Sequence, residues 1–390
     1  HGRDRRQRQM CIRDSVKAAY DADGNPTPAL TGFAKSCGVE PADLQTVETD
    51  KGERLAYSFT ESGRPTSELL QDILEQTLKS LPIPKRMRWA DRDGEFVRPA
   101  HWIAALLGDD VVPLQIFGLT AGRMTRGHRF MGEQSIEIKS PAEYHRQLEH
   151  EGKVIADFEA RKNIISTMAE AEGLKLGGNA IIDDDLLDEV TALVEWPSPI
   201  SGSFDKKFLE LPKEVPIAVM QDHQKYFPVE GKDGNLLPHF ITISYIESKD
   251  PAEVAKGNER VVYPRLEDGL FFWNQDRKQQ LEDFLPRLDG VTYQREIGSV
   301  GDRSRRIADI SKQIATLLEQ DDTQTLRAAT LCKADLVTDM VFEFTELQGT
   351  MGRYYTEASG EDAEVARAIE EHYQPRFAGD ALPQTRVGQI

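Results

Sequence analysis

Cationic and aromatic side chains alternate in one stretch of the sequence, a combination typical of contacts with nucleic acid. Arginine can bind a phosphate through two parallel hydrogen bonds, and tryptophan can stack on a base. The alternative is that Trp89 and Trp102 are core residues with solvated charges around them. The candidate RNA-binding residues of this stretch are Lys85, Arg86, Arg88, Trp89 and Arg98.

A second group of cations surrounds a glycine. Arg126 and Arg129 flank the pair Gly127-His128. Glycine has no Cβ, so its backbone can approach a partner closely, which favours a site for phosphate or carboxylate. A turn at the end of a strand, held by internal ion pairs, is an equal alternative. Arg126 and Arg129 are therefore further RNA-binding candidates.

Lys225 is the last candidate. It lies between the polar pair His223-Gln224 and the aromatic pair Tyr226-Phe227. Polar residues that end in aromatics suit the end of an RNA or the edge of a sugar. The alternative is a strand that enters the core.

The sequence lacks the motifs of common nucleotide-binding and hydrolytic sites. It contains no G-x-x-x-x-G-K-[ST] loop, no G-x-G-x-x-G fingerprint, no G-x-S-x-G elbow and no H-E-x-x-H spacing. Asp335 and His372 lie in helical patterns and invite a metal phosphohydrolase. Such a site needs a His-Asp pair, and the sequence has no His-Asp dipeptide. We therefore assign no catalytic residue, no metal ligand and no ATP site to this chain.

The hydrophobic pattern predicts the helices that position these residues. Apolar residues recur with a helical period over residues 69–81, where Pro82 and Pro84 stop the helix. A second helix is predicted over residues 186–194, behind three aspartates that suit a helix N-terminus. Only helical periods occur after about Gly298.

Strand patterns are confined to the earlier part of the chain. Residues 111–120 and 135–138 are expected to be strands. The apolar runs at residues 226–229 and 239–243 are separated by Asp233-Gly234, which predicts a β-hairpin. The fold class that follows is α+β, with a mixed region over residues 16–300. An all-helical domain is expected to begin at residue 301.

Both ends of the chain look unusual. Residues 1–15 carry five arginines and no apolar period, and they resemble a translated sequencing adaptor. We expect this extension to be disordered; a basic arm that binds nucleic acid is the alternative. The chain stops at Ile390 in a segment that looks like the start of another helix. We therefore expect the helical domain to be truncated there.

The composition limits the possible partners. The net charge is −18 and the pI is about 5.0, the wrong overall sign for binding a phosphate backbone. Residues 85–130 are locally basic, with eight Lys/Arg against five Asp/Glu. RNA binding must therefore depend on a local surface. The three cysteines are far apart, which argues against a disulfide framework, and no apolar run is long enough for a membrane span. A cytoplasmic location is expected.

Several short stretches follow one another along the chain in a distinctive order. The stretches are LPIPKRMRW (81–89), FVRP (96–99), RGHRFMG (126–132), GKVIAD (152–157), LVEWP (193–197), QKYFPV (224–229), IESKDP (246–251), MVFEFT (340–345) and YQPRFAGD (373–380). Taken in this order, they resemble the β subunit of the bacterial two-subunit glycyl-tRNA synthetase. The resemblance runs from about Tyr20 to about Pro383, and the ordered set of matches makes it specific.

The resemblance implies a fold and a division of labour. It implies a region similar to the B3/B4 domain of phenylalanyl-tRNA synthetase, then a degenerate HD-type helical domain without metal. The family's anticodon-binding part would follow and is missing from this sequence. The α subunit of the family makes glycyl-adenylate from ATP with Mg²⁺, and the β subunit binds tRNA(Gly) within an α2β2 assembly. This chain would then bind no cofactor itself.

Two other functions compete with this interpretation. One is a hydrolase, as a deacylase that edits mischarged tRNA or as an HD-type metal phosphohydrolase. Hydrolysis needs a positioned base or a metal-activated water, and the sequence offers no convincing set of residues for either. The other is a non-catalytic scaffold that binds only proteins. Titration with tRNA separates the scaffold from an RNA-binding subunit.

Overall fold

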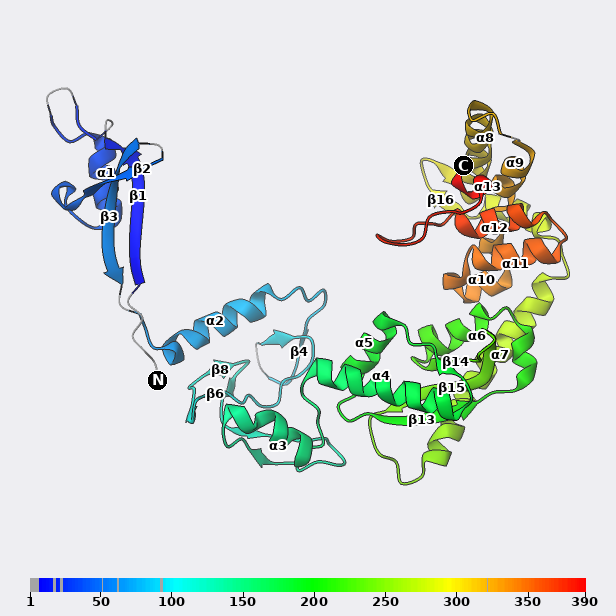
Figure 1. Ribbon diagram of the computed structural model, residues 1–390, viewed down its shortest axis with the longest axis horizontal. Helices are drawn as coiled ribbons and strands as arrows, with labels where there is room; N and C mark the ends of the chain where they lie inside the picture. Colours follow the sequence, from blue (N-terminus) through cyan, green and yellow to red (C-terminus); the bar gives the residue numbers. More distant parts are fainter. Residues whose placement is uncertain are drawn as a thin grey trace. The chain divides into compact units, whose positions relative to one another are not determined.

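The computed structural model describes residues 7–16, 19–21, 24–50, 52–61, 63–91, 94–320 and 322–390. The contacts within the chain divide it into two compact units, and Figure 1 labels their helices and strands. Unit 1 contains residues 1–125 and 135–144, and unit 2 contains residues 126–134 and 145–390. A short loop at residues 126–134 thus packs with the second unit, although residues of the first unit flank it on both sides.

Unit 1 begins with a three-stranded antiparallel sheet and one helix. The strands are β1 (Gln7–Ser15), β2 (Gln45–Thr49) and β3 (Gly52–Glu61), in the order β1-β3-β2. Helix α1 (Pro28–Cys37) starts at the Thr27 cap and ends at Gly38, whose φ of 70° favours glycine. Leu30 and Phe33 of this helix share a buried cluster with Ala19 and Leu55.

The expected disorder of residues 1–15 is wrong for residues 7–15, and residues 1–6 lie outside the described residues. Strand β1 pairs with β3 from Gln7↔Glu61 to Ser15↔Arg54. The stretch contains no proline or glycine, so each residue can take part in the backbone ladder. Backbone pairing with the free edge of β3 does not require a periodic pattern of apolar residues. The sequence of this stretch lacks such a pattern, so the strand could not be predicted from it.

Among the described residues, the rest of unit 1 contains one α-helix, four short strand pairs and a 3-10 helix at Pro141–Glu143. Helix α2 (Thr66–Ser80) confirms the predicted helix. The single strand expected at residues 111–120 is wrong, because Phe117 (φ 55°) and Gly118 (φ 71°) form a tight turn there. The paired strands are β4 (Met87–Arg88) with β5 (Glu95–Phe96), β6 (Leu106–Leu107) with β7 (Asp110–Val111), β8 (Gln115–Ile116) with β9 (Leu119–Thr120), and β10 (Met124–Thr125) with β11 (Ile136–Glu137).

Unit 2 begins with helices that pack on a four-stranded antiparallel sheet. The sheet has the order β12-β14-β15-β13 and contains the predicted hairpin, in which Gly234 takes a φ of 77°. Helix α5 confirms the second predicted helix, and the Asp183 carboxylate accepts a hydrogen bond from Leu186 N at 3.0 Å. The elements are α3 (Tyr144–His150), α4 (Phe158–Lys175), β12 (Asn179–Ala180), α5 (Asp184–Leu193), β13 (Ser198–Ser203), α6 (Glu214–Ala218), β14 (Phe227–Glu230) and β15 (Leu236–Ser244).

The remainder of unit 2 is dominated by helices. Helix α7 is the longest, and after it a short strand pair precedes α8. Beyond Ser299 the described part of the chain contains helices and connecting segments but no strand. The elements are α7 (Pro251–Asp276), β16 (Thr292–Gln294), β17 (Gly298–Ser299), α8 (Val300–Leu317), α9 (Asp322–Leu331), α10 (Asp339–Glu343), α11 (Thr350–Ala358), α12 (Ala363–Glu371) and α13 (Arg386–Gln389).

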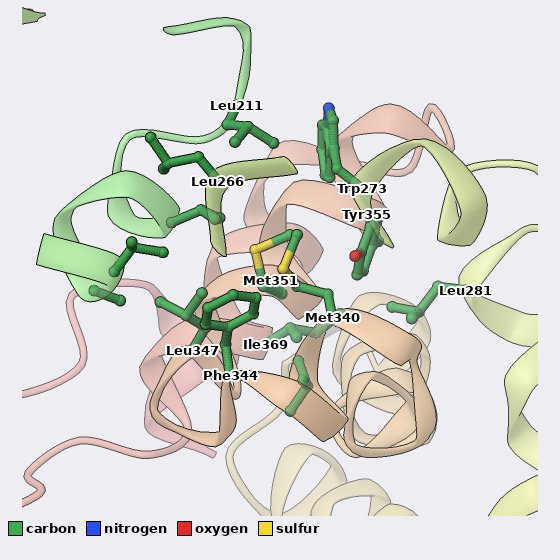
Figure 2. Close-up of a cluster of buried hydrophobic side chains, with 14 of the residues drawn as sticks. Leu211, Leu266, Trp273, Leu281, Met340, Phe344, Leu347, Met351, Tyr355 and Ile369 are labelled. Atoms are coloured by element: carbon green, nitrogen blue, oxygen red, sulfur yellow. The ribbon is translucent and has the colours of Figure 1, made fainter. Parts of the chain in front are cut away.

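The packing does not divide at residue 300, where the sequence pattern placed a domain boundary. One buried cluster joins side chains from both sides of that residue (Figure 2). Leu266 and Trp273 of α7 pack with Phe344 and Met351 of the helical part, and Phe344 is fully buried. The secondary structure therefore changes character at α8, while the hydrophobic core continues across the change.

A buried carboxylate connects the same two parts of unit 2. Asp276, the last residue of α7, accepts hydrogen bonds from the backbone N–H groups of Asp339 and Met340, both at 3.0 Å. It also accepts one from the Tyr355 hydroxyl at 2.8 Å. The carboxylate satisfies the free N–H groups at the start of α10, and burial raises the pKa of Asp276.

Among the described residues, no helix has the length and apolar character to cross a membrane.

Candidate nucleic-acid interface

The loop at residues 126–134, called here the glycine loop, packs tightly because it contains two glycines. Gly127 and Gly132 both lie against the backbone of Gly152. A Cβ on Gly127 would lie 2.5 Å from the Gly152 Cα, and one on Gly132 would overlap the Gly152 carbonyl oxygen. The sequence RGHRFMG therefore needs glycine at both positions because of close backbone approach.

Hydrogen bonds fix the conformation of the glycine loop. His128 N donates to Gly152 O at 2.7 Å, and Gly127 N donates to Glu133 O at 2.8 Å. The Gln134 amide donates to the carbonyl oxygens of His128, Arg129 and Gly132, each at 3.1 Å. A loop with so many internal partners holds its exposed side chains in defined positions.

The glycine loop presents a cation and an aromatic ring to solvent. Phe130 is 66% exposed, and Arg126 and Arg129 are exposed as well. His128 is buried instead, where its Nδ1 accepts hydrogen bonds from Phe130 N (3.2 Å) and Met131 N (3.3 Å). Its ring stacks on that of exposed Tyr245, with centroids 6.2 Å apart and an angle of 29° between the ring planes. His128 thus has a structural role, and the flanking residues face outward.

Three other stretches converge on the glycine loop, and we call the assembly the four-segment site (residues 126–134, 151–157, 193–197 and 244–251). The Lys153 ammonium lies 5.1 Å from the Trp196 ring centroid. Trp196 Nε1 donates to a Glu247 carboxylate oxygen at 3.3 Å, and Glu247 N lies 3.3 Å from the Met131 sulfur. Segments more than 100 residues apart in sequence therefore form one surface.

Two residues of this surface were missing from the sequence-based candidates. Phe130 lies between the two loop glycines, and an aromatic residue in that position was the available signal. Lys153 follows Gly152 and has a φ of 54°, but nothing local to its sequence indicates that its side chain lies over Trp196. Such a contact depends on the tertiary structure.

Lys225 is not part of the four-segment site. Its Nζ forms an ion pair with Glu189 at 2.9 Å, and its backbone has a φ of 60°. The side chain is only partly exposed, so its charge is already matched by a carboxylate of α5. This residue is therefore a weaker candidate for phosphate than Arg129.

Unit 1 places its candidates in different roles. Arg86 Nη2 donates to the carbonyl oxygens of Leu78 (3.1 Å), Lys79 (3.2 Å) and Leu81 (3.4 Å). These carbonyls lie at the C-terminus of α2, where they lack intrahelical partners and a positive charge is favourable. Arg86 is thus committed to capping α2.

Arg88 and Trp89 take part in contacts within the hairpin of β4 and β5. Arg88 Nε lies 3.2 Å from a carboxylate oxygen of Glu95, its cross-strand partner, in a solvent-exposed pair. Trp89 is half-buried, and its ring meets the edge of Phe117 with centroids 5.5 Å apart. Lys85 and Arg98 are exposed, and in the described structure neither forms an ion pair. Arg98 Nη1 contacts only the carbonyl oxygen of Val97, at 3.2 Å.

The helical part of unit 2 gives Asp335 and His372 structural partners. Asp335 is fully buried, and its Oδ2 accepts hydrogen bonds from Gly349 N (2.6 Å) and Gly352 N (3.1 Å). His372 Nδ1 lies 2.6 Å from the Ile369 carbonyl oxygen. Burial raises the pKa of Asp335 to about 6 and lowers the pKa of His372 to about 3. Within the described residues, no group of three or more His, Cys, Asp or Glu side chains is arranged to hold a metal.

Comparison with known proteins identifies what the chain is similar to. The sequence matches the family model described as glycyl-tRNA synthetase beta subunit over residues 3–390. Similar proteins, each named glycine–tRNA ligase beta subunit, come from Marinobacter nauticus (50% identical over 375 residues), Mannheimia succiniciproducens (48% over 373) and Hahella chejuensis (48% over 374). Each alignment covers 96% of this chain and 54% of the relative, so the chain spans about half the length of the curated relatives it matches.

Proposed function

Because the chain belongs to the glycyl-tRNA synthetase beta subunit family, we propose that it supports the ATP-dependent attachment of glycine to tRNA(Gly). In this proposal the chain binds tRNA and docks on a catalytic α subunit within an α2β2 assembly in the cytoplasm. ATP and Mg²⁺ act on the α subunit, and this chain holds no cofactor for the ligase reaction. The absence of the common nucleotide-binding motifs from the sequence supports that division.

The observation that carries the proposal is the exposed tip of the glycine loop. Arg129 and Phe130 combine a phosphate-binding cation with a ring that can stack on a base. The loop is held by hydrogen bonds and by close glycine contacts, so little conformational entropy is lost when RNA binds. Exposed Arg126 and Tyr245 extend the same surface.

The negative charge of the chain makes this local surface important. With a net charge of −18, the body of the protein repels a phosphate backbone over long distances at low salt. Binding must then come from short-range contacts at the four-segment site. We therefore expect few phosphates to be neutralised, and hence a shallow dependence of the tRNA affinity on salt.

We also propose domain identities for the parts of the chain. The mixed region before α8 corresponds to the B3/B4-like region, and α8 onward to the start of the degenerate HD-type domain. In the helical part, Ala334 precedes buried Asp335, and the Asp335 carboxylate accepts from backbone N–H groups instead of binding a metal. This arrangement supports a structural role for an HD-like pair that has lost its histidine.

The tRNA proposal is tested by filter binding of a tRNA(Gly) transcript at low and moderate salt. Arg129→Ala should weaken binding and reduce the slope of log K against log salt by about 1, because one phosphate contact is lost. Phe130→Leu should weaken binding by about tenfold with the slope unchanged, because stacking on a base contributes about 1–3 kcal/mol and releases no counterion. Arg306→Ala, which removes an exposed cation from α8, is the matched control.

The three single variants Arg126→Ala, Arg129→Ala and Phe130→Leu could each keep the wild-type tRNA affinity and the wild-type salt dependence. That result would exclude the four-segment site as the tRNA surface. Docking is tested separately by co-expression with an α subunit and size-exclusion chromatography. A stable complex supports the docking role, and separate elution contradicts it. Because the chain spans about half of its relatives, we expect little glycine charging from this pair.

A further inference from the structure

A cavity of about 1010 Å³ lies in the helical part of unit 2, apart from the four-segment site. Its wall includes Arg303 on α8, Lys333 after α9, and His372 and Tyr373 after α12. Two of these four side chains, Arg303 and Lys333, are cationic, in a chain with 66 acidic and 48 basic residues. The excess of positive groups at one cavity requires an explanation.

Lys333 is the most informative of these residues. It is only 5% exposed, yet no carboxylate or carbonyl oxygen among the described residues pairs with its ammonium. The ammonium lies over the Tyr373 ring, 3.8 Å from the centroid. Burial lowers the pKa of Lys333. An ammonium on a buried residue that has no ion pair is costly, so an anion that reaches it from the cavity would stabilise it.

The nearest acidic residue in sequence, Asp335, forms no ion pair with Lys333. Its Oδ2 accepts from the N–H groups of Gly349 and Gly352, and its Oδ1 is buried without a hydrogen-bond partner, so the carboxylate acts on Lys333 through its charge alone. Arg303 also lacks a carboxylate partner in the described structure, and its guanidinium lies 4.4 Å from the Tyr293 ring centroid. Among the described residues, neither cation at the cavity therefore has a carboxylate oxygen within ion-pair distance.

Two polar atoms at the cavity are also unsatisfied. The Tyr373 hydroxyl and Nε2 of His372 are buried without a hydrogen-bond partner among the described residues. Buried polar groups in folded proteins nearly always have partners, and exceptions often indicate an absent ligand or ion. Nε2 of His372 is itself an acceptor, because the neutral ring donates through Nδ1 to the Ile369 carbonyl oxygen. The ammonium of Lys333, the guanidinium of Arg303 and the hydroxyl of Tyr373 are donors, so the group that completes these three must be an acceptor.

We propose that this cavity binds a phosphate group, held by Lys333, Arg303 and Tyr373. Phosphate fits better than carboxylate, because its oxygens can accept from three donors on separate elements while its charge balances two cations. The cavity has room for more than a single phosphate, so the group can belong to a larger molecule. This site goes beyond the proposed function, which assigns no ligand to the helical part.

The test uses the chain in phosphate-free buffer, with orthophosphate and pyrophosphate titrated at constant ionic strength by calorimetry. Lys333→Met should weaken binding by about tenfold or more, since it removes a charged hydrogen bond to the ligand. Lys312→Met removes an exposed lysine from α8 and should leave the affinity within about twofold. Absence of saturable binding to the wild type, or equal binding to Lys333→Met, would overturn the proposal.

Stability measurements distinguish loss of the site from loss of the fold. Without phosphate, Lys333→Met should keep or raise the Tm, because an unpaired buried charge is replaced by an apolar chain. Phosphate should raise the Tm of the wild type and not that of Lys333→Met. Tyr373→Phe, which removes only the unsatisfied hydroxyl, is the second variant. It should also retain the fold and bind phosphate more weakly, and unchanged binding in both variants would contradict the assignment.

A tRNA transcript distinguishes the possible sources of the phosphate. If RNA supplies it, Lys333→Met also weakens tRNA binding, and free phosphate competes with tRNA for the wild type. If a small molecule supplies it, Lys333→Met loses phosphate binding with an unchanged affinity for tRNA. Both results support a phosphate site. If Lys333→Met binds both phosphate and tRNA with the affinity of the wild type, the phosphate site is excluded.

Discussion

At the scale of single residues, Arg86 and Arg129 show how much the surroundings of a cation decide. Both are arginines beside a glycine-rich or proline-rich turn, and both were candidates for RNA contact. The Arg86 guanidinium is bound to three carbonyl oxygens at the end of α2, whereas Arg129 is exposed at the tip of the glycine loop. Arg86 stabilises a helix, and Arg129 remains available to a partner.

Two buried residues should give the helical part opposite responses to pH. The folded state protonates His372 only near pH 3, against about 6.5 when unfolded, so its stabilising contribution is lost as pH falls from about 6.5. The folded state keeps the proton of Asp335 up to about pH 6, against 3.8 when unfolded. Its contribution is present at low pH and is lost as pH rises from about 4 to 6.

Replacing one of these two residues should therefore leave the pH dependence of stability that the other residue causes. Relative to the wild type, His372→Gln should lose stability as pH rises from 4 to 6, and Asp335→Asn should gain it. Each change amounts to a few kcal/mol at most, since one pKa unit corresponds to about 1.4 kcal/mol. Both replacements remove the titrating group, and Asn at position 335 keeps an oxygen that can accept from Gly349 and Gly352. Urea unfolding at several pH values, in phosphate-free buffer, measures the slopes, and parallel curves for all three proteins would contradict the assignment.

At the scale of elements, the glycine loop owes its position to contacts with a distant turn. Its backbone pairs with that of residues 151–152, and Arg129 and Phe130 face solvent at its tip. The close approach to Gly152 fixes both loop glycines. A single methyl group at the contact should therefore disturb the whole loop.

Gly132→Ala tests this dependence. The new Cβ would overlap the Gly152 carbonyl oxygen, so the loop must move. We expect a loss of about 1–3 kcal/mol in the free energy of unfolding, the usual effect of overpacking, together with weaker tRNA binding. Gly257→Ala is the control: its Cβ meets nothing within 4 Å in α7, so the helix should gain about 0.5–1 kcal/mol. Urea unfolding measures both, and equal effects would refute the packing argument.

At the scale of the molecule, unit 2 is held together by one core. The cluster in Figure 2 draws side chains from α7 and from the helices after residue 300, and the Asp276 carboxylate adds hydrogen bonds between the same parts. The stacked pair His223 and Phe344, with centroids 5.4 Å apart, adds a further contact across that position. We therefore expect the sheet and the helices of unit 2 to unfold together.

A pair of phenylalanines two residues apart provides the test. Phe344 is fully buried and Phe342 is 80% exposed. Phe344→Ala should destabilise unit 2 by about 3–5 kcal/mol in one transition that includes the four-stranded sheet. Phe342→Ala should change the stability by less than about 0.5 kcal/mol. Hydrogen exchange of amides in β15 and α12 measures the coupling, and loss of protection in α12 alone would show that the parts unfold separately.

The sequence by itself determined the features with a local physical cause. The helical periods gave α2 and α5, Asp233-Gly234 gave the hairpin of β14 and β15, and the ordered stretches indicated the family. Strand β1 and the turn at Phe117 were missed, because one depends on a distant sheet edge and the other on a φ that phenylalanine rarely adopts.

Only the tertiary structure decided which of the charged residues have internal partners. It matched Lys225 with Glu189, committed Arg86 to a helix end, left Arg129 exposed and enclosed Lys333 without an ion pair. Backbone preferences and hydrophobic periods act over a few neighbouring residues, so a sequence displays them directly. The partner of a charge is set by segments far apart in the chain, and it exists only once the core has brought them together.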